Sequence, residues 1–108
     1  MIENTPQEVK DIIDKSKNQP LILDVREQWE YDICHIENSI HIPMGKIANI
    51  NNDELETDGA IIVVCHHGIR SRMVAKYLVT KGFKDVINLT GGIDAWSSNI
   101  DPSISKYV

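Results

Sequence analysis

The chain has 108 residues, with 11 lysines and arginines against 16 aspartates and glutamates, and hence a formal charge of −5. This length predicts one domain over residues 1–108, large enough for a hydrophobic core without disulfide bonds. The acidic balance excludes nucleic acid or an anionic membrane as the main partner, because both attract clustered lysine and arginine. No apolar run approaches the ~18 residues of a membrane span. The amino terminus lacks a signal-peptide pattern and cysteines are few, so we expect a cytoplasmic protein.

A helix with a clear start signal is expected near the amino terminus. Thr5 is a favourable N-cap, Pro6 fits the first helical position, and Glu8 completes a capping box. Apolar residues follow at helical spacing until the sequence Asn-Gln-Pro at 18–20. The pattern therefore predicts a helix that begins at Pro6 and ends before this breaker.

Short apolar segments farther along the chain indicate buried strands. Strands are predicted at residues 21–25, 39–42, 60–64 and 86–89. The segment 60–64 is the strongest, because its continuous β-branched residues suit a strand that is buried on both faces. Between the first two strands, residues 26–31 are expected to form one helical turn that packs Trp29 inward.

The clearest helix, 71–81, lies between the last two predicted strands. Its apolar face consists of Val74, Ala75, Leu78 and Val79. Gly82 follows as the C-cap. Weaker helical spacing over 44–58 predicts one or two short helices.

A last short helix opens at the glycine pair 91–92 and carries Trp96, and the tail from Ser97 is polar. Strands that alternate with helices and are apolar on both faces indicate an α/β fold. We therefore predict a central, mostly parallel sheet of four or five strands with helices on both faces.

The loop 65–71, Cys-His-His-Gly-Ile-Arg-Ser, joins the strongest strand directly to the clearest helix. Ligands of open parallel sheets bind beyond the carboxyl ends of the strands, and a helix N-terminus attracts anions. The same helix end and Arg70 stabilise a thiolate, so Cys65 is a predicted nucleophile. Gly68 allows the loop to curl around the sulfur. The alternative, an inert buried thiol, does not explain why strand, glycine, arginine and helix start coincide.

Four segments in order resemble the family of rhodanese-like sulfurtransferases. The loop 65–71 resembles the C-x-x-G-x-R-S active-site loop of the family. Three other stretches are similar to L-D-V-R-E-x-W-E-Y, G-H-I-x-x-A-x-x-I-P and G-G-x-x-A-W, at residues 23–31, 35–43 and 91–96. The likeness extends from residue 5 to about residue 107.

The resemblance implies a rhodanese-like fold and a ping-pong transfer of sulfane sulfur without a cofactor. The Cys65 thiolate would take sulfur from thiosulfate or a persulfide donor and pass it to cyanide or a thiol. Arg70 would neutralise the anionic donor and steady the thiolate. The catalytic residue is then Cys65, and the substrate-binding loop residues are His66, His67, Gly68, Ile69, Arg70 and Ser71. The implied partners are these small molecules and, in addition, a sulfur-relay protein.

Other functions compete with this hypothesis. Cysteine phosphatases of the same fold have five residues between cysteine and arginine, whereas four separate Cys65 from Arg70 here. The shorter loop suits a sulfur atom better than a tetrahedral phosphate. A non-enzymatic persulfide carrier or a regulatory binding module is the second alternative. Binding modules of the family have lost the cysteine, so the presence of Cys65 disfavours that form.

The histidines and cysteines do not have the spacing of metal ligands. His66 and His67 are adjacent, and because adjacent side chains usually diverge, we predict no metal site. These two histidines are expected either to line the entrance to the loop or to be solvated. Cys34 stands where the family usually has glycine. It is interpreted as a small residue tolerated in a loop or, alternatively, as a resolving thiol for the persulfide.

Charged residues directly follow the first predicted strand. Asp24, Arg26 and Glu27 are interpreted as a buried network of ion pairs and hydrogen bonds, with a structural role. Trp29 and Trp96 are predicted to anchor the core.

Overall fold

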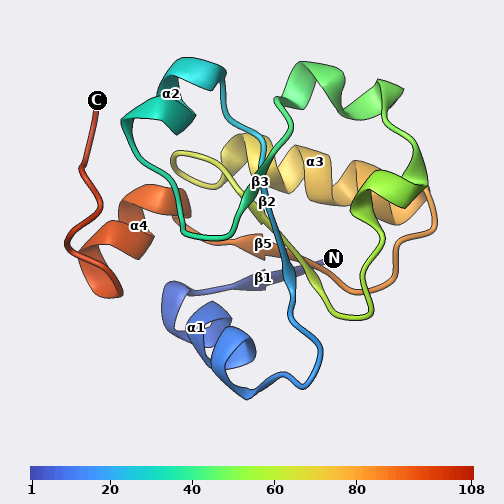
Figure 1. Cartoon of the computed structure of the whole chain (residues 1–108), viewed down its shortest axis with the longest axis horizontal. Helices are drawn as coiled ribbons and strands as arrows, with labels where there is room; N and C mark the ends of the chain where they lie inside the picture. The colour runs from blue at the N-terminus through green and yellow to red at the C-terminus, as the bar shows by residue number, and fades with distance from the viewer.

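A computed structural model describes residues 1–108 and contains one five-stranded sheet. The strands are β1 (Ile2–Asn4), β2 (Leu21–Asp24), β3 (Ile40–His41), β4 (Ile61–Val64) and β5 (Val86–Leu89). Their order across the sheet is β1-β5-β4-β2-β3, and every pairing is parallel. The predicted α/β class and the predicted parallel sheet are therefore confirmed (Figure 1).

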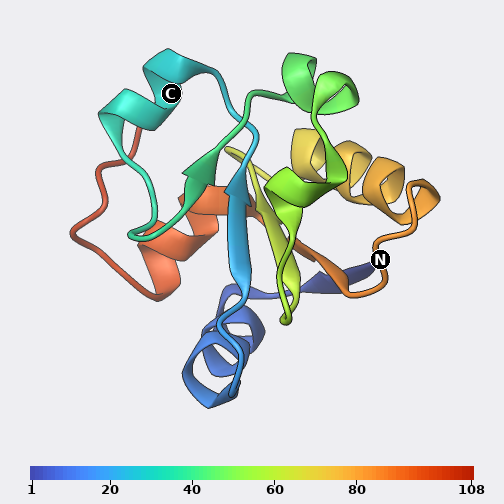
Figure 2. The same ribbon diagram turned by 45° about the vertical axis from the view of Figure 1, so that its right-hand side comes forward.

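Helices cover both faces of this sheet, as Figure 2 shows from a second direction. The α-helices are α1 (Pro6–Lys15), α2 (Gln28–Ile33), α3 (Ile69–Thr80) and α4 (Gly92–Asn99). Two 3₁₀ helices, η1 (Met44–Asn49) and η2 (Asn52–Leu55), occupy the segment where short helices were predicted. No helix is long and apolar enough to span a bilayer.

The alternation of side chains along β4 divides the hydrophobic core into two clusters. Ile61, Val63 and Cys65 pack under α3 and the 3₁₀ helices. Ile62 and Val64 point to the opposite face, where they pack against α1 and α4. Cys65 thus lies directly at the end of a strand that is buried on both faces, as the sequence predicted.

Local sequence signals account for the starts of the first and third helices. The capping box of α1 is present, since the Glu8 amide donates to the Thr5 hydroxyl and the Thr5 amide donates to the Glu8 carboxylate. Helix α3 begins at Ile69, two residues earlier than predicted, and follows Gly68 in the left-handed region at φ 100°. Its apolar face is buried except for Val79, which is exposed.

Two predictions about the amino-terminal half need correction. Strand β1 was not predicted, because its three residues carry no pattern of their own and gain their order from pairing with β5. Trp29 was predicted to pack inward, yet it is 58% exposed. Helix α2 instead turns Glu30 toward the interior, where its carboxylate pairs with Arg70. Trp96 is buried, as predicted.

Candidate active site

Cys65 lies beneath the loop that connects β4 with α3. Its side chain is buried, with 1% of the residue exposed. The Gly68 amide donates a hydrogen bond to Sγ at 3.0 Å, and the Ser71 hydroxyl lies 3.2 Å from the same atom. The sulfur therefore accepts a hydrogen bond from the loop at the positive end of a helix, an environment that stabilises a thiolate.

The first residues of α4 are hydrogen-bonded to the backbone of this loop and fix its position. The amides of Ile93 and Asp94 donate to the carbonyl oxygens of Cys65 and His66, at 2.8 and 3.1 Å. Gly92 has φ 63°, and a Cβ there would lie 2.4 Å from both carbonyl oxygens. Only glycine allows the two backbones to approach this closely. The glycine pair therefore belongs to the site, and its resemblance to a family motif was the signal in the sequence.

Five of the seven predicted site residues line one open pocket of about 300 Å³. They are Cys65, His66, His67, Ile69 and Arg70. Ile69, the one large apolar residue that lines this pocket, is 65% exposed. The other two predicted site residues, Gly68 and Ser71, do not line the pocket but contact Cys65 Sγ.

Arg70 does not extend freely toward a donor, because it is paired with Glu30. Its two terminal nitrogens bind the two carboxylate oxygens at 2.7 and 2.8 Å. The Glu30 side chain is 4% exposed and that of Arg70 34%. Burial raises the pKa of Glu30, but hydrogen bonds from Arg70 and Tyr107 outweigh burial and lower it to about 2. Hydrogen bonding to Glu30 likewise raises the pKa of Arg70.

Sequence reasoning missed Tyr107, which comes back to the site from the predicted polar tail. Its hydroxyl donates to Glu30 Oε2 at 2.6 Å and accepts from Arg26 Nη1 at 3.1 Å. Burial and the bond to Glu30 raise the pKa of Tyr107 to about 12, so the hydroxyl remains a donor at neutral pH. The ring stacks on His66 with centroids 3.9 Å apart and meets the exposed Trp29 edge to face.

Asp24 and Arg26 form the buried network that the sequence predicted. Arg26 Nη2 lies 2.7 Å from Asp24 Oδ2, and both residues are buried. Further bonds from Arg26 reach the carbonyl oxygens of Glu30 and Cys34. Glu27 was wrongly included in this network: it is exposed and caps α2. Charge pairing satisfies the buried arginine, which fits a structural role for Asp24 and Arg26.

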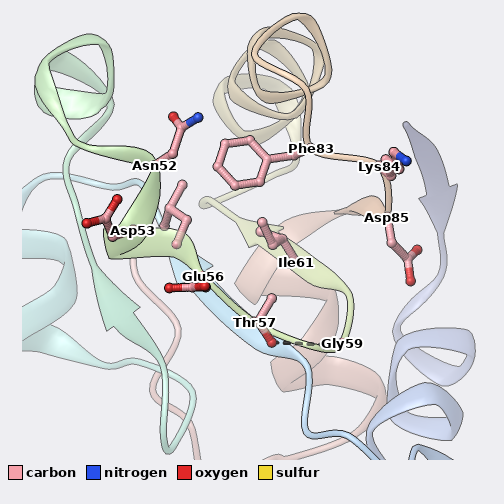
Figure 3. Close-up of a pocket in the computed structure, with 10 residues that line it drawn as sticks. Asn52, Asp53, Glu56, Thr57, Gly59, Ile61, Phe83, Lys84 and Asp85 are labelled. Atoms are coloured by element: carbon pink, nitrogen blue, oxygen red, sulfur yellow. Dashed lines mark hydrogen bonds between the residues drawn. The ribbon is translucent and has the colours of Figure 1, made fainter.

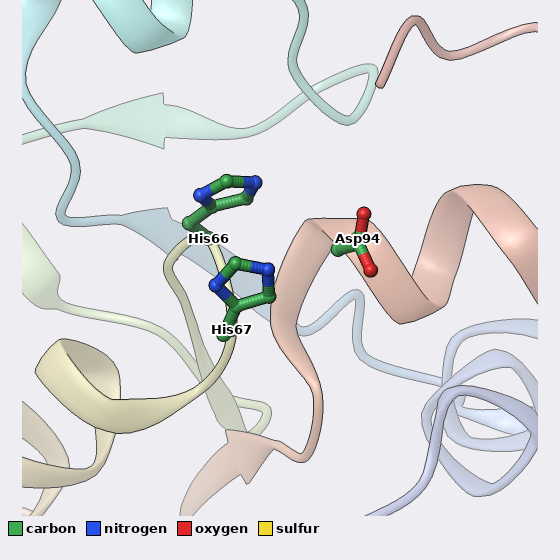
Figure 4. Close-up of side chains that lie close together, drawn as sticks. All are labelled: His66, His67 and Asp94. Atoms are coloured by element: carbon green, nitrogen blue, oxygen red, sulfur yellow. The ribbon is translucent and has the colours of Figure 1, made fainter. Parts of the chain in front are cut away.

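The two loop histidines stack on each other, contrary to the expectation that their side chains diverge. Their ring centroids lie 3.8 Å apart, and Figure 4 shows one ring above the other beside Asp94. Burial and the neighbouring His67 lower the pKa of His66, so that ring is neutral at pH 7. Its Nε2 is buried without a hydrogen-bond partner.

His66, His67 and Asp94 place their possible ligand atoms within 4.8 Å of one another. One contact opposes a shared ion, because the Asp94 carboxylate already pairs with Lys106 at 3.1 Å. The absence of a metal site stays a prediction.

Cys34 and Cys65 are both free thiols. Cys34 is half-buried at the end of α2 and packs against the core cluster beside α1 and α4, while Cys65 belongs to the cluster beside α3. This packing fits the interpretation of Cys34 as a small tolerated residue.

The largest cavity, about 470 Å³, lies elsewhere (Figure 3). It is bordered by η2, by Gly59 and Ile61 where β4 begins, and by Phe83 and Asp85 before β5. None of the predicted site residues lines it. It therefore sits at the amino ends of the strands, opposite the end that carries Cys65.

Comparison with known proteins agrees with this geometry. Residues 5–99 match the model of the rhodanese-like domain family. The chain belongs to this family. The thiosulfate sulfurtransferase GlpE of Coxiella burnetii is 37% identical over 83 residues, 77% of each chain. The putative sulfur carrier protein YrkF of Bacillus subtilis is 41% identical over 80 residues, 74% of this chain and 43% of YrkF.

Solved structures of rhodanese-like proteins superpose closely. A rhodanese-like domain protein from Staphylococcus aureus has a TM-score of 0.81 at 31% identity, with both chains fully covered. A rhodanese-related protein from Thermoplasma volcanium has a TM-score of 0.82 at 28% identity, over 97% of this chain and 98% of that one. The rhodanese-like family and its sulfurtransferase members support sulfur transfer as the class of activity. Tyr107 lies beyond the matched residues 5–99.

Proposed function

We propose that this rhodanese-like domain transfers sulfane sulfur through a persulfide on Cys65. The observation that carries the proposal is the position of Sγ, which lies at the N-terminus of α3 and accepts a hydrogen bond from the Gly68 amide at 3.0 Å. A thiolate at that point needs no separate general base. The loop that stabilises it also stabilises a negative charge on one further sulfur atom.

The reaction consists of two displacements. In the first, the Cys65 thiolate attacks the outer sulfur of thiosulfate, the S–S bond of the donor breaks, and sulfite leaves with the bonding electron pair. The terminal sulfur of the resulting persulfide carries the negative charge. In the second, cyanide or an acceptor thiolate attacks this terminal sulfur, and the Cys65 thiolate leaves with its electron pair.

The pairing of Arg70 with Glu30 supports a second role as a carrier that receives sulfur from a persulfide. Thiosulfate is a dianion, and its binding gains most from an unpaired cation. Here the charge of Arg70 is offset by an ionised, buried carboxylate at 2.7 Å. A persulfide donor carries less charge and depends less on Arg70. The similarity to a putative sulfur carrier also supports this role.

Intact-mass spectrometry tests the proposal directly. The purified protein is treated with thiosulfate or with a low-molecular-weight persulfide. Its mass is then measured before and after treatment with cyanide. We expect a gain of about 32 Da, one sulfur atom, which cyanide removes. Cys65→Ser should abolish the gain, while the matched variant Cys34→Ser should retain it.

The outcomes separate the two roles. Loading by thiosulfate at a rate comparable with the persulfide supports a thiosulfate sulfurtransferase. Loading by the persulfide alone supports the carrier. The proposal is contradicted if the protein gains no sulfur from either donor. It is also contradicted if the Cys65→Ser variant gains as much sulfur as the unmodified protein.

A further inference from the structure

The side-chain amide of Asn88 is buried and is hydrogen-bonded to the Ser71 hydroxyl, which in turn contacts Cys65 Sγ. Asn88 is the only polar residue of β5, and it is fully buried beside Val63 of β4. A polar side chain inside a parallel sheet is costly unless it is hydrogen-bonded. Its neighbours in the strand belong to the hydrophobic core. The presence of an amide here therefore calls for a specific set of partners.

Those partners fix the orientation of the amide. The Nδ2 group of Asn88 donates to the Gly68 carbonyl oxygen at 3.1 Å and to Glu3 Oε1 at 2.8 Å. A carbonyl and a carboxylate only accept, so both N–H groups are used and the amide cannot be reversed. Oδ1 therefore faces the hydroxyl of Ser71, to which it is hydrogen-bonded.

The Ser71 hydroxyl has one proton and two neighbours that compete for it. One is Asn88 Oδ1, and the other is Cys65 Sγ at 3.2 Å. The carbonyl oxygen of Asn88 cannot donate, so the Ser71 proton lies on the Asn88 side as long as Cys65 is a thiol. The contact between Ser71 and the sulfur is then completed by the proton of the thiol.

Ionisation of Cys65 changes this balance. A thiolate attracts the Ser71 proton, but the transfer leaves Oδ1 of Asn88 buried without a donor, which is unfavourable. In the persulfide the charge lies on the terminal sulfur, and Sγ is bonded to two atoms and carries no full charge. Ser71 can then donate to Asn88 again.

We propose that Asn88 is a positioning residue which, by holding the Ser71 proton, favours the states of Cys65 in which Sγ is uncharged. These states are the thiol and the sulfur-loaded persulfide. Asn88 thereby stabilises the loaded form relative to the free thiolate, as a domain that stores sulfur between two displacements requires. The statement about the loaded form rests on the proposed function, whereas the effect on ionisation does not.

A double-mutant cycle tests the inference through the ionisation of Cys65. All variants carry Cys34→Ser, so that one thiol reports, and the rate of alkylation by iodoacetamide is measured against pH. Asn88→Val should move the half-maximal rate to lower pH by about one unit, a tenfold gain in thiolate at pH values below the midpoint. In the presence of Ser71→Ala, the same substitution should leave only the smaller shift that arises from the lost bond to the Gly68 carbonyl.

The cycle separates the hydroxyl proton from effects on the loop. Asn88→Val also removes the donor to the Gly68 carbonyl, and this effect persists without Ser71. An equal shift in both backgrounds, or no shift in either, overturns the inference. Circular dichroism verifies folding, and Asn88→Ala replaces the valine variant if that variant does not fold.

Sulfur loading supplies a second, independent readout. Thiosulfate and sulfite are kept at a fixed ratio, and the ratio of sulfur-loaded to unloaded protein is measured. This ratio should be up to about tenfold lower for Asn88→Val than for the protein with Asn88. A protein whose Cys65 gains no sulfur at all refutes the proposed function, and the alkylation cycle still decides the role of Asn88.

Discussion

Replacing Tyr107 with phenylalanine removes one hydroxyl from the centre of the site and leaves the ring stacked on His66. The hydroxyl joins Glu30 Oε2 at 2.6 Å to Arg26 Nη1 at 3.1 Å. A hydrogen bond to a charged group contributes about 1.5–3 kcal/mol. Both partners keep other bonds, because Glu30 retains Arg70 and Arg26 retains Asp24. We therefore expect the free energy of unfolding at pH 7 to fall by about 2 kcal/mol in total.

The size of this loss should depend on pH, because Glu30 is ionised in the fold. Its pKa is about 2, against an ordinary value of 4.5. Since the folded pKa is lowered, the carboxylate stabilises the protein above pH ~4.5, by roughly 3 kcal/mol. That contribution is lost as the pH falls from ~4.5 toward 2. The deficit of Tyr107→Phe should therefore shrink across this range.

Urea unfolding followed by tryptophan fluorescence at pH 7, 5 and 3 measures the effect. Tyr77→Phe is the matched control, because Tyr77 is half-buried against Lys81 and its hydroxyl makes no hydrogen bond. A deficit below ~0.5 kcal/mol at pH 7 is within the range of ordinary surface substitutions and would refute the reasoning. An equal deficit in Tyr77→Phe would do the same.

Four further substitutions test other parts of the structure. Gly92→Ala places a Cβ 2.4 Å from the carbonyl oxygens of Cys65 and His66, so we expect the free energy of unfolding in urea to fall by about 3 kcal/mol and sulfur loading to decrease. Gly45→Ala, where a Cβ would lie in open space, should change neither. His66→Gln should flatten the fall of melting temperature below pH ~6.5, because the half-buried ring has a lowered pKa and the unfolded chain takes up the proton first; an unchanged slope, with His35→Gln for comparison, would contradict this. Asp24→Asn leaves the Arg26 charge buried without its partner and should cost about 3–5 kcal/mol in the same unfolding assay, so a loss below ~1 kcal/mol would count against the ion pair. Cys34→Ser should leave the loading of Cys65 and its inactivation by peroxide unchanged, and a several-fold change in either would support a resolving thiol.

Elements that depend on neighbours in the sequence were predictable. The capping box of α1 and the apolar strand β4 satisfy their requirements within a few residues, and both are present. The loop from Cys65 to Ser71 was also found, because glycine, arginine and a helix start occur together there. Family resemblance added the glycine pair that holds the loop. The capping box, the strand and the loop share one property: their physical reason is local.

The missed features depend on contacts between distant segments. Glu30 is buried because Arg70 binds it from 40 residues away, and Tyr107 contacts Glu30 across 77 residues. Helix α2 has only six residues, too few for periodicity to show that Glu30 faces inward and Trp29 outward. Asn88 is a single polar residue in an otherwise apolar strand. No local pattern distinguishes such a residue from a solvent-exposed one.

The pairing of β1 with β5 also determines when the surroundings of Cys65 are completed during folding. Glu3 on β1 binds the Asn88 amide, a contact that closes a loop of 85 residues. Closing so long a loop is entropically costly and slow compared with forming the local contacts of β4 and α3. We therefore expect a folding population in which the Cys65 loop has formed while β1 is still detached. In that population the Cys65 thiol should be alkylated faster than in the native protein, which pulse labelling with iodoacetamide during refolding would detect.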